Sequence, residues 1–231
     1  MSHAVEARRL LRSCSSGALA TLSRRLRGYP FVTAVPFMTD FDGSLVLLIS
    51  RLAEHTKNIE EDPRVSLLAH EPSGDVQAAA RLTVAGMCDR IAAHSDLKER
   101  YVRRFPQAND LLRLDFDFHR IQPTAIRYIG GFGKTHWIEP VSLMVDTGID
   151  ASIEHVWLQR VNDSYSQDLS RACTSESRPP SDVRAVALDC DGVDVRIGNA
   201  PQTLRLAFAR SVTTTDELTV AFDKLLRREA S

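Results

Sequence analysis

The first 140 residues alternate short apolar runs with turn residues, a pattern typical of an antiparallel sheet. An amphipathic helix is predicted over residues 4–12, a polar helix after Arg51, and a third helix over residues 95–105 with Ser95 as its N-cap. Because few helices interrupt the strands, the pattern favours a closed antiparallel barrel over a βαβ sheet. The predicted strands cover residues 17–22, 31–37, 44–49, 65–69, 79–93, 115–122, 125–129 and 135–138.

A second pattern begins after a predicted hinge at residues 140–148. Helical periodicity over residues 153–161 and 166–173 precedes a loop rich in Ser and Pro. Three strand-like runs (185–189, 193–197 and 204–208) and a closing helix over residues 215–228 follow. We therefore expect two domains, a barrel over residues 1–140 and a small α+β domain over residues 150–231.

Composition narrows the classes of function. The formal charge of −1 and the lack of a long basic block argue against nucleic acid as a partner. The four cysteines lie far apart and never form C-x-x-C, which argues against a structural zinc site and a disulfide framework. No N-terminal signal pattern and no apolar run of membrane-spanning length is visible. We expect a soluble, cytoplasmic protein that binds no membrane and no metal ion directly.

The segment from Leu45 to His70 carries most of the candidate chemistry. It predicts a strand, a polar helix and a second strand, which place hydrogen-bond donors at the mouth of a sheet. The first turn of the helix adds unpaired N–H groups and the positive end of its dipole. This arrangement suits an acidic cofactor, bound through a phosphate or a propionate. The predicted contacts are Ser50, Arg51, His55, Thr56, Lys57 and Asn58.

His55 is the first candidate for catalysis, because a histidine can donate a proton near neutral pH. The alternative is an exposed histidine on a helix with no functional role. The glycine-rich run 130–136 contributes Gly131, Lys134 and His136, with a β-bulge at a barrel rim as the alternative. Arg81 either pairs with an anion or caps a hairpin.

Asp115, Asp117 and His119 fall at period two and so share one face of a predicted strand. They could ligate a metal ion, but a solvent-facing strand is the favoured interpretation. No hydrolase motif stands out in the sequence.

Three separated motifs then resemble a known family. They are PFVTAVPF (30–37), SRLAEHTKNIEEDPRVSLL (50–68) and IQPTAIRYIGGFGKTHWI (121–138). Together they resemble the pyridoxamine 5′-phosphate oxidase-like split-barrel superfamily, and within it the HugZ-like haem-utilisation branch. The resemblance implies a homodimer of six-stranded antiparallel split β-barrels with the cofactor near the dimer interface. Flavin members bind FMN there, whereas HugZ-like members bind haem, which some degrade with oxygen and a reductant.

Two positions decide between these cofactors. Flavin members carry a phosphate-binding lysine at the position of His55, and a histidine there is the pattern of the haem branch. That branch also has an aspartate eight residues before the Q-P proline, which is Asp115 in this sequence. The resemblance therefore favours haem over FMN and makes His55 and Asp115 the catalytic candidates.

The tail resembles a small haem-associated domain whose helix usually carries H-M-N-x-D-H. Arg160 and Tyr165 replace the two histidines. Arginine is no ligand for haem iron, whereas tyrosine can be, so Tyr165 joins the cofactor candidates. We expect a haem-binding protein that could degrade haem, with an electron donor that the sequence does not identify. An FMN-dependent oxidoreductase and a non-catalytic binding or regulatory module remain alternatives.

Overall fold

The computed structural model describes residues 2–70, 75, 77–131, 135–143, 147–173 and 180–227. Contacts divide the chain into two compact units. Unit 1 comprises Met1–Ala93 and Gln107–Val145, and unit 2 comprises His94–Pro106 and Asp146–Ser231. The segment His94–Pro106 thus groups with the C-terminal unit, although it lies within the first 140 residues.

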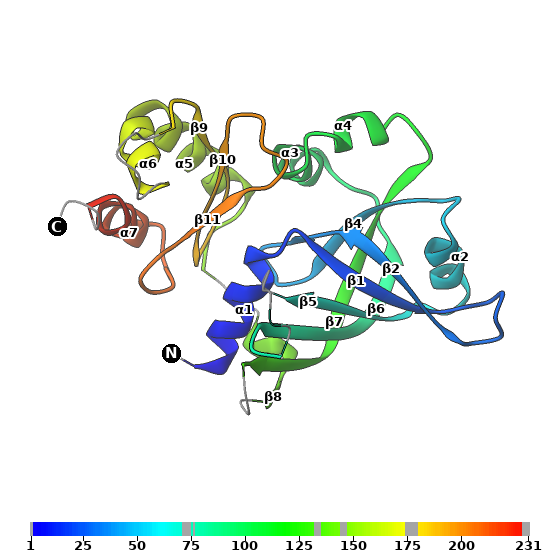
Figure 1. The fold of residues 1–231 in the computed structure, drawn as a ribbon. Helices are drawn as coiled ribbons and strands as arrows, with labels where there is room; N and C mark the ends of the chain where they lie inside the picture. Colours follow the sequence, from blue (N-terminus) through cyan, green and yellow to red (C-terminus); the bar gives the residue numbers. More distant parts are fainter. Residues whose placement is uncertain are drawn as a thin grey trace. The chain divides into compact units, whose positions relative to one another are not determined.

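Unit 1 is a curled antiparallel sheet in the order β2-β1-β5-β6-β7-β4-β3, with β8 paired to β7 (Figure 1). The predicted split-barrel fold of the α+β class is confirmed. The sheet has eight strands rather than six, because β3 and β8 add two short ones. The strands are β1 (Ser16–Leu22), β2 (Pro30–Pro36), β3 (Met38–Thr39), β4 (Leu45–Ser50), β5 (Arg64–His70), β6 (Ala80–Arg90), β7 (Phe116–Gly130) and β8 (Thr135–Ile138).

The core of unit 1 forms where the apolar face of helix α1 (His3–Ser13) meets the inner face of the sheet. Ala7 and Leu11 are fully buried and belong to the same cluster as Leu47, Leu67 and Leu82. Strand β4 is buried at every position from Leu45 to Ile49, as its unbroken apolar sequence requires. Short helices α4 (Ala108–Leu111) and η1 (Pro140–Ser142) complete the unit.

Strand β7 runs unbroken through Pro123, where the sequence analysis placed a break between two strands. Its register with β6 shifts between Ala85 and Gly86, so that Gly86 lies opposite Pro123. The shift removes the ladder hydrogen bond that proline cannot donate. A Cβ at Gly86 would lie 2.2 Å from the carbonyl oxygen of Gln122, so only glycine fits at this point of the β6–β7 pairing.

Helix α2 (Glu54–Glu61) is anchored to the strands by buried polar side chains. Thr56 donates its hydroxyl to the carbonyl of Ser50 (2.6 Å). Asn58 is fully buried; its Nδ2 donates to Thr21 Oγ1 (2.9 Å) and its Oδ1 accepts from the backbone N–H of Arg24 (3.1 Å). These two residues of the predicted cofactor site therefore turn their polar groups into the fold.

Unit 2 contains a three-stranded antiparallel sheet in the order β11-β10-β9 with four helices. Asp150 caps α5, and His94 caps α3 through Nδ1, so the prediction of Ser95 as that cap is wrong. Trp157 stacks on Phe222 to form part of its core. The elements are α3 (Ser95–Arg104), α5 (Ala151–Ser164), α6 (Ser166–Ala172), β9 (Val183–Asp189), β10 (Gly192–Ile197), β11 (Leu204–Ala207) and α7 (Asp216–Arg227). Within the described ranges, no helix has both the length and the apolar character needed to cross a membrane.

Replacing Asn58 with alanine should destabilise the protein by about 2–3 kcal/mol, because the buried Thr21 hydroxyl and the partly buried Arg24 N–H both lose a partner. Urea unfolding followed by circular dichroism measures the change. Asn109→Ala, at an exposed position of α4, is the matched control and should change stability by less than about 0.5 kcal/mol. Equal stability of the two variants would contradict an anchoring role for Asn58.

Candidate functional site

A polar cluster lies where β4 ends and α2 begins. The hydroxyl of Ser50 donates to the carboxylate of Asp115, and the backbone N–H of Arg51 donates to the Asp115 carbonyl (2.8 Å). The Leu52 N–H donates to Ser50 Oγ (3.0 Å) and also approaches the carboxylate (3.4 Å). The Ser50 hydrogen bond lowers the pKa of Asp115. Asp115 is therefore a fixed, ionised hydrogen-bond acceptor at neutral pH.

His55 lies on the first turn of α2, with its Nδ1 hydrogen-bonded to Thr33 Oγ1 (3.1 Å). Its Nε2 is enclosed and has no hydrogen-bond partner among the described residues. Burial, and then the neighbouring His119, lower the pKa of His55. The ring is therefore uncharged at neutral pH and can accept a proton only at lower pH.

His119 lies on β7 and is only 3% exposed, so the prediction of a solvent-facing strand is wrong for this residue. Its Nδ1 is 3.2 Å from the carbonyl oxygen of Asp117. Burial is the main cause that lowers the pKa of His119. The two histidines thus form a neutral pair beneath the polar cluster.

The carboxylate of Asp117 lies next to two exposed arginines. Its carboxylate lies 3.1 Å from Arg90 Nη2 and 3.7 Å from Arg51 Nε. Arg51 and Arg90 therefore share one carboxylate at this end of the barrel, beside the ionised Asp115. Lys57, half-buried on α2, belongs to the same end.

A second group of predicted residues lies at the other end of β7. The β6–β7 register pairs Arg90 with His119 and Ala80 with Gly130, so the ten intervening steps of β6 separate the two groups by roughly 33 Å along the strand. Figure 1 shows α2 and β8 at opposite ends of the curled sheet. The structure therefore brings Ser50, Arg51, His55 and Asp115 together and leaves the second group apart.

Three members of the second group, Arg81, Gly131 and His136, have local contacts or backbone geometry that the structure describes. Arg81 donates from Nη1 to the carbonyls of Gln77 and Ala79 (both 3.3 Å). Gly131 has φ +95°, in the left-handed region that favours glycine. His136 stacks on His3 with ring centroids 3.7 Å apart. Lys134 lies outside the described residues, and Tyr165 belongs to unit 2, where it separates α5 from α6.

A groove that the sequence pattern did not predict lies on the outer face of the sheet. It has a volume of about 490 Å³ and mostly apolar walls. The signal was present in β1, where the outward positions Ala18, Ala20 and Leu22 are all apolar although they alternate with buried residues. The groove is lined by Ala20, Thr21, Leu22, Pro30, Arg64, Val65, Ser66, Ala85, Gly86, Met87 and Thr124.

Around the groove the outer face carries several exposed apolar side chains, next to polar ones such as Ser66 and Thr83. Register pairs Val32 with Ala20 and Leu68 with Ala18, so these side chains form rows across β2, β1 and β5. Val32 is 59% exposed, Leu68 37% and Met87 38%. Exposed apolar side chains grouped on one face of a sheet are a common feature of interaction surfaces.

The lowered pKa values predict how stability depends on pH. Below the ordinary histidine value of about 6.5, the unfolded chain binds protons that the folded His55 and His119 do not. Their contribution to the free energy of unfolding is therefore complete above that pH and is lost as the pH falls toward 5. His119→Gln should flatten the pH dependence of urea unfolding between pH 7 and 5. Curves of equal slope for the variant and the wild type would contradict this.

Comparisons with known proteins agree with the fold. Residues 1–144 match the family described as CREG, beta-barrel. The chain is 33% identical over 133 residues to the non-canonical heme oxygenase HOZ, chloroplastic, of Arabidopsis thaliana, covering 57% of this chain and 41% of that protein. It is 30% identical over 129 residues to the heme oxygenase HutZ of Vibrio cholerae, covering 52% and 72%. The chain therefore spans less than half the length of the chloroplastic relative.

Two solved structures extend the similarity to both units. The crystal structure of the protein Atu2129 (unknown function) from Agrobacterium tumefaciens is 27% identical, with a TM-score of 0.76, over 97% of this chain and 94% of that one. The heme binding protein from Mycobacterium smegmatis is 25% identical, with a TM-score of 0.57, over 99% and 97%. The predicted family is confirmed. The chain belongs to the CREG β-barrel family, among the haem-utilisation split barrels.

Proposed function

We propose that the protein binds haem in the apolar groove of unit 1, between two copies of the chain. The observation that carries the proposal is this groove, on a sheet face that carries several exposed apolar side chains. Two curated relatives are named heme oxygenases, and one similar solved protein is named a heme binding protein. Haem is a flat apolar molecule with acidic side chains. A groove that binds it should therefore offer apolar walls and a positively charged group at its margin.

The residues of the groove fit such a molecule. Ala20, Leu22 and Val65 offer apolar walls that exclude water, and Arg64 at the margin offers a guanidinium for a propionate. Asp62 holds that guanidinium in a bidentate pair (2.5 and 2.9 Å) and so fixes its orientation. When bound, haem would supply the iron at which oxygen is reduced. Met87 brings a thioether sulfur to the groove; the described lining contains no histidine.

The polar cluster at the α2 end completes the proposal. His55 is an uncharged imidazole that can take up a proton, and Asp115 is a carboxylate held ionised by Ser50. Thr21 links this end to the groove, since it lines the groove and accepts the hydrogen bond of Asn58. We assign proton handling to His55, and hydrogen-bond acceptance to Asp115.

Pairing of two copies would cover the exposed apolar rows. The rows through Val32, Leu68 and Met87 continue the groove across four strands, so a second copy placed there would enclose the ligand. The proposal includes a homodimer, oxidative cleavage of haem with an external reductant, and a cytosolic location in keeping with four cysteines that form no disulfide in the described chain.

The lack of a positive charge on His55 disfavours FMN as the ligand. Flavin members of the superfamily resemble this chain but carry a lysine at that position, whose cation meets the phosphate. The lowered pKa of His55 leaves the ring neutral, so it cannot replace that cation.

Titration of the full-length protein with haemin tests the proposal. We expect saturable binding with a Soret shift, and no comparable binding of FMN. Val32→Asp places a charge in the apolar face and should convert the dimer to a monomer by light scattering and weaken haemin binding at least tenfold. Val141→Asp, at an exposed valine outside the face, is the matched control and should behave like the wild type.

Three results would overturn the proposal. The first is the absence of a saturable Soret change in the wild type. The second is haemin binding by Val32→Asp with unchanged affinity, which would place the ligand elsewhere. The third is a monomeric wild type that binds haemin with full affinity, because the groove would then need no second copy.

A further inference from the structure

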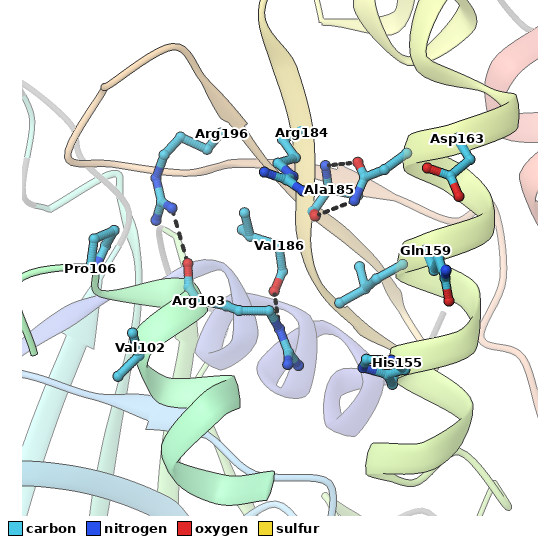
Figure 2. Close-up of a pocket in the computed structure, with 12 residues that line it drawn as sticks. Val102, Arg103, Pro106, His155, Gln159, Asp163, Arg184, Ala185, Val186 and Arg196 are labelled. Carbon is cyan, nitrogen blue, oxygen red and sulfur yellow. Dashed lines mark hydrogen bonds between the residues drawn. The ribbon is translucent and has the colours of Figure 1, made fainter. Parts of the chain in front are cut away.

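Unit 2 contains a second cavity, separate from the groove of unit 1. Its volume is about 670 Å³, and its walls come from α3, α5, β9 and β10. Val102, Leu158 and Val186 supply apolar surface. Polar groups surround that surface, and the positively charged ones dominate: the lining has three arginines (Arg103, Arg184 and Arg196) and one carboxylate, Asp163. Figure 2 shows these side chains around the cavity.

Two of the arginines are direct cross-strand neighbours. The register of β9 with β10 pairs Arg184 with Arg196, after a shift between Asp194 and Val195. Side chains of directly opposed residues lie on the same face with their Cβ atoms about 5 Å apart, and like charges in this position are destabilising. The pair therefore carries a cost in the free protein that an anion would remove.

The described part of the protein does not neutralise this pair. Neither Arg184 nor Arg196 forms an ion pair with a described carboxylate, and Arg196 Nε is buried without a hydrogen-bond partner. Burial, and then the charge of Arg104, lower the pKa of Arg196. The surroundings of this guanidinium are thus short of negative charge.

Two buried acids close to the cavity, Glu154 and Asp194, are already paired with other arginines. Glu154 is fully buried; its carboxylate accepts from Arg103 (2.5 Å), Arg100 (3.1 Å) and the Leu188 N–H (3.0 Å). Asp194 pairs with Arg104 and lies 3.4 Å from Arg205. Glu154 supplies one negative charge to two arginines, Arg100 and Arg103. The cavity wall therefore keeps a net positive charge.

The cavity is held open by its own hydrogen bonds. Asn162 on α5 clamps the edge strand β9, accepting from the Ala185 N–H (2.8 Å) and donating to its carbonyl (3.0 Å). Arg196 donates to the carbonyl of Arg103 (3.0 Å; Figure 2) and to that of Arg104 (2.8 Å), which fixes β10 to the end of α3. A preformed cavity binds with less loss of conformational entropy.

We infer that this cavity binds a small phosphate monoester with a flat apolar body, whose phosphate is held by the guanidinium of Arg184 beside the positive charge of Arg196. A phosphate monoester carries nearly two negative charges and three terminal oxygens, which suit the exposed guanidinium fork of Arg184 next to the second positive charge of Arg196. The apolar surface of Val102, Leu158 and Val186 receives the body of the ligand. This site is independent of the haem groove proposed for unit 1.

Arg184 is the residue on which to test the inference, because it is exposed and holds no other element in place. Calorimetric titration of the full-length protein at low ionic strength uses AMP, adenosine and inorganic phosphate as probes. We expect saturable binding of AMP, weaker binding of inorganic phosphate and none of adenosine. Arg184→Gln should weaken AMP binding about tenfold. Arg171→Gln, at an exposed arginine of the same unit, is the matched control and should bind AMP like the wild type.

Competition with haemin separates this inference from the proposed function. Saturating haemin should leave the AMP affinity unchanged, and failure of haemin to bind would not affect the result. No saturable AMP binding, equal affinity for AMP and either adenosine or inorganic phosphate, or unchanged binding by Arg184→Gln would overturn the inference. Displacement of AMP by haemin would also overturn it, because the cavity would then belong to haem.

Discussion

Unit 1 depends on how strand β7 pairs with strand β6 where the register shifts at Gly86. Strand β7 pairs with β6, β4 and β8, so its course decides where both ends of the barrel lie. It can continue through Pro123 only because Gly86 has no side chain; a Cβ there would lie within 2.2 Å of the Gln122 carbonyl oxygen. The shift of register at this point lets one strand carry Asp117 and His119 at one end and Gly130 at the other.

The places of Asp115, His55 and His119 in the barrel also affect which of them is charged at neutral pH. Asp115 lies just before β7, near the surface, where a hydroxyl and backbone N–H groups favour its ionised form. His55 and His119 lie deeper, where burial disfavours the charged form. An ionised acceptor and two neutral imidazoles therefore stand side by side at neutral pH without an ion pair between them. Burial of the two imidazoles and the hydrogen bond of Ser50 to Asp115 thus strengthen the charge difference that the residue types already set.

Much of the fold could be predicted because most strands bury one face and so keep their period of two. The site was predicted less completely. Thr56 and Asn58 are polar residues on a polar helix, and nothing in their spacing shows that they turn inward to Ser50 and Thr21. Arg81 and His55 are only 26 residues apart in the sequence, yet the long β6–β7 ladder places them at opposite ends of the barrel.

The arginine pair of unit 2 lay beyond sequence reasoning for a related reason. Arg184 and Arg196 face each other only because the register of β9 and β10 shifts after Asp194, and such a shift leaves no signal in the periodicity of either strand. Arg196 has a structural role at the end of α3, but Arg184 has no hydrogen bond or ion pair among the described residues. Two like charges directly opposite each other in a sheet are unfavourable, and here no described carboxylate offsets them. Such an uncompensated pair points to a ligand that does. Arg184 is therefore better explained by an anion that it binds than by the stability of the sheet that carries it.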